Sequence, residues 1–226
     1  MKITCAELIR WAGLSALTAG IIFAAIQPIH PPDTLASTLT AEWAVITPIK
    51  TVMCVLFLLG LTGLYTRQVA QTGRLGLVGF LLLSLSWVLQ LAFVFGETFI
   101  MPLLATTAPK FVEGYLGLAS GHASEVPLGA LPALYTVVGV TYMLGGLVFG
   151  IATFRAKILP RWTTGLLAVA SALTPLAALL PHAIQRYAAV PVGLALACMG
   201  YALWTQRQTQ RSEAGPGAEG FQLPRP

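Results

Sequence analysis

The sequence predicts an all-α, polytopic membrane protein: a bundle of six transmembrane helices with both termini in the cytoplasm. Three observations predict this fold class. Only 9% of the 226 residues are Asp, Glu, Lys or Arg, and 56% are hydrophobic, whereas a soluble domain carries about 25% charged residues. The apolar residues are gathered into long runs. The basic residues fall mainly on one side of those runs.

Six apolar runs have about the 20 residues that a helix needs to cross a bilayer core of about 30 Å. They cover residues 11–29, 45–65, 75–96, 132–154, 163–181 and 187–205. The first run follows Lys2 and Arg10, as a signal peptide would. We expect it to be a retained span, because it exceeds the usual length of a signal-peptide core and no small-residue cleavage site follows it.

Residues 1–205 are therefore expected to form one membrane domain, with a long outer loop at 98–131 and a tail at 206–226. Four charged or histidine residues interrupt 103–125, so we expect no seventh span there. A short amphipathic helix around Phe111–Leu118 fits the loop, lying on the membrane surface. The tail ends in a stretch rich in Gly, Pro and Glu, a composition typical of disorder, and is expected to be cytoplasmic.

The basic residues orient this bundle, because Lys and Arg concentrate in cytoplasmic segments. With the N-terminus inside, ten of them lie on the inner side: Lys2, Arg10, Arg67, Arg74, Arg155, Lys157, Arg161, Arg207, Arg211 and Arg225. Only Lys50, Lys110 and Arg186 fall on the outer side. The expected location is a bacterial plasma membrane, with both termini cytoplasmic.

A polar site is predicted at the outer face, where all three histidines and most carboxylates fall. Its candidate residues are Lys50, Gln90, Glu97, His30, His182 and Tyr135. Ionisable groups at membrane depth usually face the protein interior and find partners, so we expect Lys50 and Glu97 to form an ion pair. Gln90 precedes Glu97 by two helical turns on the same face. The alternative is that Lys50 extends to the headgroups and Glu97 only ends its span in water.

No metal, cofactor or nucleic acid is expected. The candidate metal ligands are His30, His122 and His182, which with Glu97 or Glu113 would suffice in number. However, no HxxxH or HExxH pair places two of them on one helix face.

 The three cysteines lack the paired spacing of a disulfide framework. Neither a phosphate-binding GxxxxGK[ST] loop nor a GxSxG nucleophile elbow occurs in the sequence. The basic residues alternate with apolar runs instead of gathering beside aromatic ones, which argues against a nucleic-acid surface.

Three short motifs resemble segments of a known group. They are Gly96-Glu97-Thr98-Phe99-Ile100-Met101-Pro102-Leu103-Leu104-Ala105 followed by Ala108-Pro109, then Ile29-His30-Pro31, and Leu159-Pro160-Arg161-Trp162. On these motifs the chain resembles small six-span integral membrane proteins of bacteria that have no known activity, over most of residues 8–205. The resemblance implies a topology and an inner-membrane location, and it assigns no functional residue.

The function that we expect is that of an accessory or small-molecule-binding membrane component, with a polar site near the outer face. Its partners would be the lipid bilayer and either a second copy of the chain or another membrane protein. One alternative is a small transporter or channel that uses Lys50, Gln90 and Glu97. Another is a membrane enzyme acting on a lipid or isoprenoid, although such enzymes usually carry denser pairs of carboxylates or histidines. The sequence does not decide whether the protein is an enzyme, although it favours a protein without catalytic activity.

Overall fold

A computed structural model describes residues 3–177 and 179–213, without the side chains of residues 182, 183 and 206–213. This part of the chain forms helices and loops and contains no strand. Its elements are α1 (Cys5–Ile26), η1 (Ala36–Leu39), α2 (Ala41–Thr66), α3 (Val69–Phe95), η2 (Gly96–Ile100), α4 (Met101–Leu104), α5 (Pro109–Gly117), α6 (Leu131–Ala156), α7 (Arg161–Ala177), α8 (His182–Gln185), η3 (Arg186–Ala188) and α9 (Ala189–Glu213).

Five helical runs within the described residues are long and apolar enough to cross a membrane. They are Cys5–Ile26, Ala41–Thr66, Val69–Leu104, Leu131–Ala156 and Arg186–Thr205. Large apolar side chains remain exposed along their outer faces, as expected where the solvent is lipid. The chain is therefore a helical membrane-protein bundle.

Local sequence signals explain where several helices begin and turn. Thr4 and Glu7 form a capping box at the start of α1, which satisfies backbone N–H groups that have no partner inside the helix. The side chain of Thr40 caps α2 by accepting from the N–H of Trp43. Gly73 has φ +56° and breaks the helical path just after the α2–α3 turn, a conformation that glycine adopts without steric cost.

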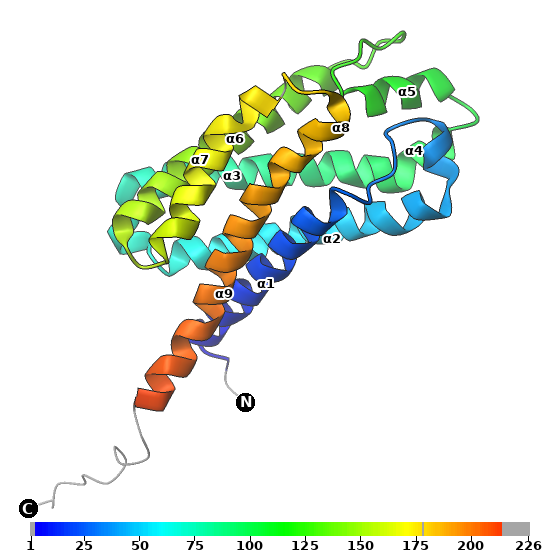
Figure 1. The fold of residues 1–226 in the computed structure, drawn as a ribbon. Helices are drawn as coiled ribbons and strands as arrows, with labels where there is room; N and C mark the ends of the chain where they lie inside the picture. The colour runs from blue at the N-terminus through cyan, green and yellow to red at the C-terminus, as the bar shows by residue number, and fades with distance from the viewer. Residues whose placement is uncertain (1–2, 178, 214–226) are drawn as a thin grey trace, which may run out of the picture.

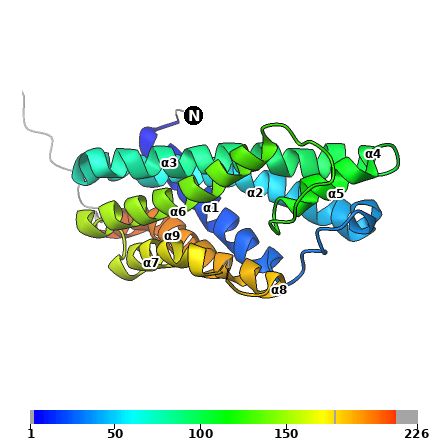
Figure 2. The same cartoon turned by 90° about the horizontal axis from the view of Figure 1, so that it is seen from above.

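The two ends of the bundle can be told apart by the turns that meet there (Figures 1 and 2). At one end, Gln68 of the α2–α3 turn donates to Thr153 near the end of α6, at 3.2 Å. We call this end, with the α6–α7 turn and the start of α1, the hairpin half. At the other end, Arg186 donates to the carbonyl oxygen of His30 at 2.9 Å and joins η3 to the end of α1. We call that end, with η2, α5 and α8, the cavity half.

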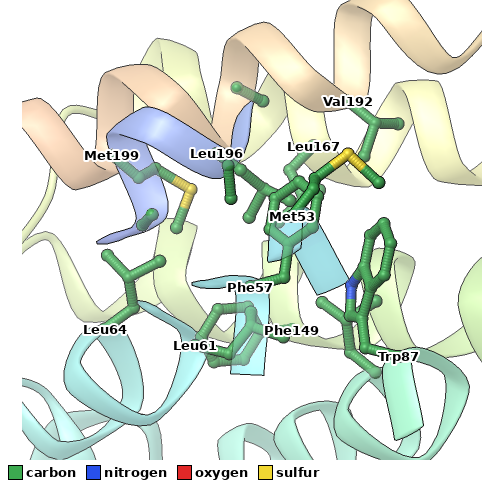
Figure 3. Close-up of a cluster of buried hydrophobic side chains, with 14 of the residues drawn as sticks. Met53, Phe57, Leu61, Leu64, Trp87, Phe149, Leu167, Val192, Leu196 and Met199 are labelled. Carbon is green, nitrogen blue, oxygen red and sulfur yellow. The ribbon is translucent and has the colours of Figure 1, made fainter. Parts of the chain in front are cut away.

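Close helix packing and apolar side chains fill the hairpin half and the middle of the bundle. Helices α1 and α9 run side by side in opposite directions (Figure 1), and a Cβ atom added at Gly20 would lie 2.4 Å from the carbonyl oxygen of Gly193. Small residues permit such contact between membrane helices. Figure 3 shows the apolar side chains that converge here from several helices, among them Phe57, Phe149 and Met199.

Helix α7 occupies the place of the fifth expected span, 163–181, and it is shorter than the others. It has 17 residues, which gives a length of about 26 Å, and it is absent from the five long apolar runs. It nevertheless connects the two ends of the bundle, because the end of α6 lies in the hairpin half and η3 lies in the cavity half.

Two other expected boundaries differ from the structure. The third expected span ends at 96 and the outer loop begins at 98, whereas the helical run continues through η2 and α4 to Leu104. The rest of that loop contains α5, at the place of the expected short helix. The expected tail begins at 206, whereas α9 continues to Glu213; residues 214–226 lie outside the described part of the chain.

Candidate functional site

A short π-helical turn, η2, shapes the site around Glu97. Within this turn the N–H of Met101 donates to the carbonyl oxygen of Gly96, five residues earlier. The next donor in this pattern would come from Pro102, which has no N–H. The carbonyl oxygen of Glu97 is therefore left without a partner in the helix, and the indole N–H of the buried Trp43 donates to it at 3.1 Å. Such π turns are frequent at functional sites.

Lys50 and Glu97 form the ion pair that the sequence led us to expect. Lys50 Nζ lies 2.5 Å from Glu97 Oε1, and the two side chains are only 14% and 12% exposed. The same ammonium group lies 2.8 Å from His30 Nε2. Three separate segments therefore meet at one point: α2 supplies Lys50, the π turn supplies Glu97, and the segment after α1 supplies His30.

The hydrogen bonds of His30 assign its protonation state. Its Nδ1 lies 2.6 Å from the carbonyl oxygen of Pro31, which can only accept, so Nδ1 carries a proton. Its Nε2 faces the ammonium group of Lys50, which can only donate, so Nε2 accepts. His30 is therefore a neutral imidazole in this arrangement. The carboxylate of Asp33 lies 3.9 Å from Nδ1.

Tyr115 covers the π turn from the short helix α5. Its hydroxyl group donates to the carbonyl oxygen of Phe93 at 2.8 Å. Burial raises the pKa of Tyr115 above its usual range, and the nearby carboxylate of Glu97 raises this pKa further. The hydroxyl therefore keeps its proton and stays a donor. Thr98 similarly donates to the carbonyl oxygen of Val94 at 2.7 Å.

A cavity of about 560 Å³ opens beside these groups. Its charged lining comes from the segment after α1, from α2, from η2 and from η3, and consists of Asp33, Lys50, Glu97 and Arg186; the neutral His30 lies among them. Most of its other lining is apolar or aromatic and includes Phe23, Met53, Trp87, Phe93, Val138 and Tyr142. The cavity therefore has a charged end near Glu97 and an apolar end near Trp87.

The apolar end of the cavity carries two polar atoms of its own. The indole nitrogen of Trp87 and the hydroxyl oxygen of Tyr142 are buried without a hydrogen-bond partner among the described residues. The ring of Trp87 stacks on that of Phe57 at 4.1 Å between centroids. The cavity therefore borders the apolar core at Trp87, which belongs to both.

Five of the six candidate site residues line this one cavity: His30, Lys50, Gln90, Glu97 and Tyr135. The sixth, His182, stands at the start of α8, and its side chain lies outside the described part of the structure. Gln90 and Tyr135 make no side-chain hydrogen bond to the other described residues, so their polar groups are available to a bound molecule. That these residues form a functional site stays a prediction.

His122 lies apart from the ion pair, in the loop after α5. Its Nδ1 pairs with the hydroxyl of Ser120 at 2.5 Å, and it lines a second cavity of about 710 Å³. This second cavity shares Gln27, Asp33 and Arg186 with the first. The two cavities are therefore neighbours, with Asp33 and Arg186 at the boundary between them.

One group of residues has the spacing of a metal site. Among the described residues, ligand atoms of His30, Asp33 and Glu97 lie within 4.8 Å of one another. The ammonium group of Lys50, however, already pairs with Glu97 and His30. A metal ion there would compete with this ammonium group for Glu97 and His30.

Sequence reasoning missed four residues of this arrangement: Asp33, Trp43, Tyr115 and Arg186. Asp33 carried a usable signal, because it follows His30 by only three residues. The role of Trp43 depends on a π turn, and that of Tyr115 depends on how α5 folds back, so neither leaves a local pattern. Comparisons of the chain with models of protein families, with curated proteins and with solved structures give no significant match.

Proposed function

We propose that this chain is a membrane protein that binds a small amphipathic molecule in the cavity beside Lys50 and Glu97. The cavity itself carries the proposal. Its volume of about 560 Å³ lies within the range of small-molecule sites, about 300–1,000 Å³, which are mostly apolar with a few placed polar groups. The charged end would hold the head of the molecule, and the aromatic end near Trp87 would hold its apolar body.

The spacing of α6 and α7 supports access to this cavity. In the hairpin half the two helices touch, since a Cβ atom added at Gly150 would lie 2.7 Å from the backbone nitrogen of Ala168. Gly139, three turns earlier in α6, lines the cavity, and a Cβ atom added there would meet no atom within 4 Å. The helices therefore separate toward the cavity half, where Thr174 of α7 also lines the cavity.

A cavity-filling substitution tests the proposal. Gly139→Phe places a ring in open space, whereas the control Gly165→Phe lies in α7 outside the cavity, where an added Cβ atom makes ordinary contact with Phe154 at 3.6 Å. The full chain and both variants are purified in native lipid nanodiscs, and extracted molecules are quantified by mass spectrometry. We expect a species that is enriched over bulk lipid in the wild type and in Gly165→Phe and depleted in Gly139→Phe. Equal content in all three would overturn the proposal.

The orientation belongs to the same proposal: six crossings, both termini in the cytoplasm of a bacterial cell, and the cavity near the outer face. The bias of basic residues and the passage of α7 between the two ends support it. Its test uses cysteine-free protein with one added cysteine, at Ala123 or at Gln71, both exposed. An impermeant maleimide added to intact cells should label Ala123→Cys only; labelling of Gln71→Cys alone would reverse the orientation.

Catalysis is a second candidate, favoured by one observation. His30 Nε2 lies 3.6 Å from Glu97 Oε1 at the charged end of the cavity, and such a pair can exchange protons with a bound substrate. A transport path has less support, because buried apolar side chains such as Phe57, Leu61 and Phe149 fill the bundle below the cavity. If the enriched species is converted to a product on prolonged incubation and Glu97→Gln stops the conversion, the protein is an enzyme. A homo-oligomer or an accessory partnership remains compatible with ligand binding.

A further inference from the structure

The charges around the cavity point to the kind of molecule that it binds. We infer that the ligand has a polar but uncharged head, such as a hydroxyl or carbonyl group, on an apolar body. This inference rests on the proposed function, since it presupposes that the cavity holds a ligand. It adds a preference for the charge of the ligand head, which the presence of a cavity alone does not imply.

The charges of the described groups that line the cavity sum to zero. Lys50 and Arg186 are positive, Asp33 and Glu97 are negative, and the hydrogen bonds of His30 make it neutral. The remaining described polar lining from α3, α5, α6 and α7 consists of neutral groups, such as Gln90 and Tyr135. A charged head would leave one uncompensated charge in a largely apolar site, which is costly away from water. An uncharged head leaves the site balanced.

The free hydrogen-bonding groups suit such a head. Gln90 and Tyr135 face the cavity from α3 and α6 and have no side-chain partner among the described residues. The ammonium group of Lys50 has three protons, of which Glu97 and His30 take two. These groups offer donors to a hydroxyl or carbonyl oxygen, and Gln90 and Tyr135 can also accept. Single hydrogen bonds of this kind add specificity without a change in net charge.

The same chemistry predicts how selectivity changes when one charge is removed. Glu97→Gln leaves the site with one net positive charge, which an anionic head would balance. Lys50→Met leaves one net negative charge, which a cationic head would balance. The double variant Lys50→Met/Glu97→Gln is again neutral and should again prefer an uncharged head. A purely structural ion pair would not produce this reversal of preference.

The test uses three probes with the same chain: dodecan-1-ol, dodecyl sulfate and dodecylammonium. Dodecan-1-ol is titrated below its solubility limit, and the two ionic probes below their micelle-forming concentrations. Each competes with labelled dodecan-1-ol bound to the full chain in nanodiscs, and Gly139→Phe nanodiscs correct for partition into lipid. We expect the wild type to bind dodecan-1-ol at least about tenfold more tightly than either charged probe, a difference of about 1.4 kcal/mol. Glu97→Gln should prefer dodecyl sulfate, Lys50→Met should prefer dodecylammonium, and the double variant should return to dodecan-1-ol.

The outcomes distinguish a failure of the uncharged-head inference from a failure of the proposed function. Tighter binding of dodecyl sulfate or dodecylammonium to the wild type, or an unchanged preference in Glu97→Gln, overturns the uncharged-head inference and leaves the proposed function intact. If no probe binds the wild type more than it binds Gly139→Phe, and no molecule co-purifies, the proposed function itself fails. Should Lys50→Met not fold, Glu97→Gln and the double variant still decide the matter, because they differ by one charge.

Discussion

The hairpin half and the cavity half of this bundle are built from the same helices but packed by different means. In the hairpin half, glycine and alanine bring helix backbones together, and apolar side chains fill what remains (Figure 3). In the cavity half, a π turn interrupts α3, the helices α6 and α7 separate, and charged groups surround a cavity of about 560 Å³. Helix α6 runs through both halves: its Gly150 is tightly packed in the hairpin half, and its Gly139 faces open space in the cavity half.

This difference indicates which half supplies stability and which is available for binding. Every void forfeits packing contacts, so a cavity destabilises a bundle unless other contacts offset it. The close contacts between α1 and α9 and between α3 and α6 can offset this loss of packing. Substitutions at the close contacts of the hairpin half should therefore prevent folding, whereas single substitutions in the cavity half should lower stability by smaller amounts or alter binding.

The largest effect is expected from placing the same residue at a glycine in each half. Gly150→Leu drives a side chain into the backbone of α7, because even its Cβ atom would lie 2.7 Å from the backbone nitrogen of Ala168. We expect little or no monodisperse protein after extraction. Gly139→Leu should give a wild-type yield and melting temperature, as judged by size-exclusion chromatography and circular dichroism. Similar yields for the two variants would remove the distinction between the halves.

The next effect concerns the ion pair. Glu97→Leu leaves the ammonium group of Lys50 without its carboxylate at low exposure, and breaking a buried pair in this way costs about 3–5 kcal/mol. The value expected here is near the lower limit, since the cavity gives the ammonium group some access to water. The double variant Lys50→Met/Glu97→Leu should recover most of the loss in reversible unfolding in detergent. Additive losses would mean that the two side chains do not interact.

A smaller effect should follow from the hydrogen bond that supports the π turn. Trp43→Phe keeps an aromatic ring but leaves the partly buried carbonyl oxygen of Glu97 without this donor, which costs about 1–3 kcal/mol. The matched control is Trp11→Phe, because Trp11 is 64% exposed and should tolerate the change within about 0.5 kcal/mol. Equal stability of the two variants would contradict the assigned role of Trp43.

The smallest effects should have opposite signs at two tyrosines. Tyr115→Phe removes the bond to the carbonyl oxygen of Phe93 and should cost about 1 kcal/mol. Tyr142→Phe removes a buried hydroxyl that has no partner among the described residues, so stability should stay the same or rise by up to about 1 kcal/mol. A loss at Tyr142 equal to that at Tyr115 would show that a water molecule or ligand satisfies the Tyr142 hydroxyl.

The sequence predicted the class of fold and much of the candidate site. The long apolar runs predicted a helical membrane bundle, and the ends of α2 and α6 fall close to the expected positions. It also predicted that Lys50 and Glu97 would pair, because two opposite charges at similar depth have few other partners. The sequence placed the end of the fifth run, at 181, beyond the end of α7, which has 17 residues. It also placed the end of the third run too early in the chain. An ionisable residue such as Glu97 lowers local hydropathy but does not end a helix.

Composition and spacing by themselves determined that this chain forms a helical membrane bundle, with its histidines and most carboxylates at one end of the spans and most of its basic residues at the other. These properties depend on transfer free energies and helical periodicity, which are local. Only the tertiary structure decided that His30 joins the ion pair, that Trp43 satisfies the carbonyl oxygen of Glu97, and that α6 and α7 separate to leave a cavity. Those features depend on contacts between residues far apart in the chain, for example 54 positions for Trp43 and Glu97, and such contacts exist only once the helices have packed.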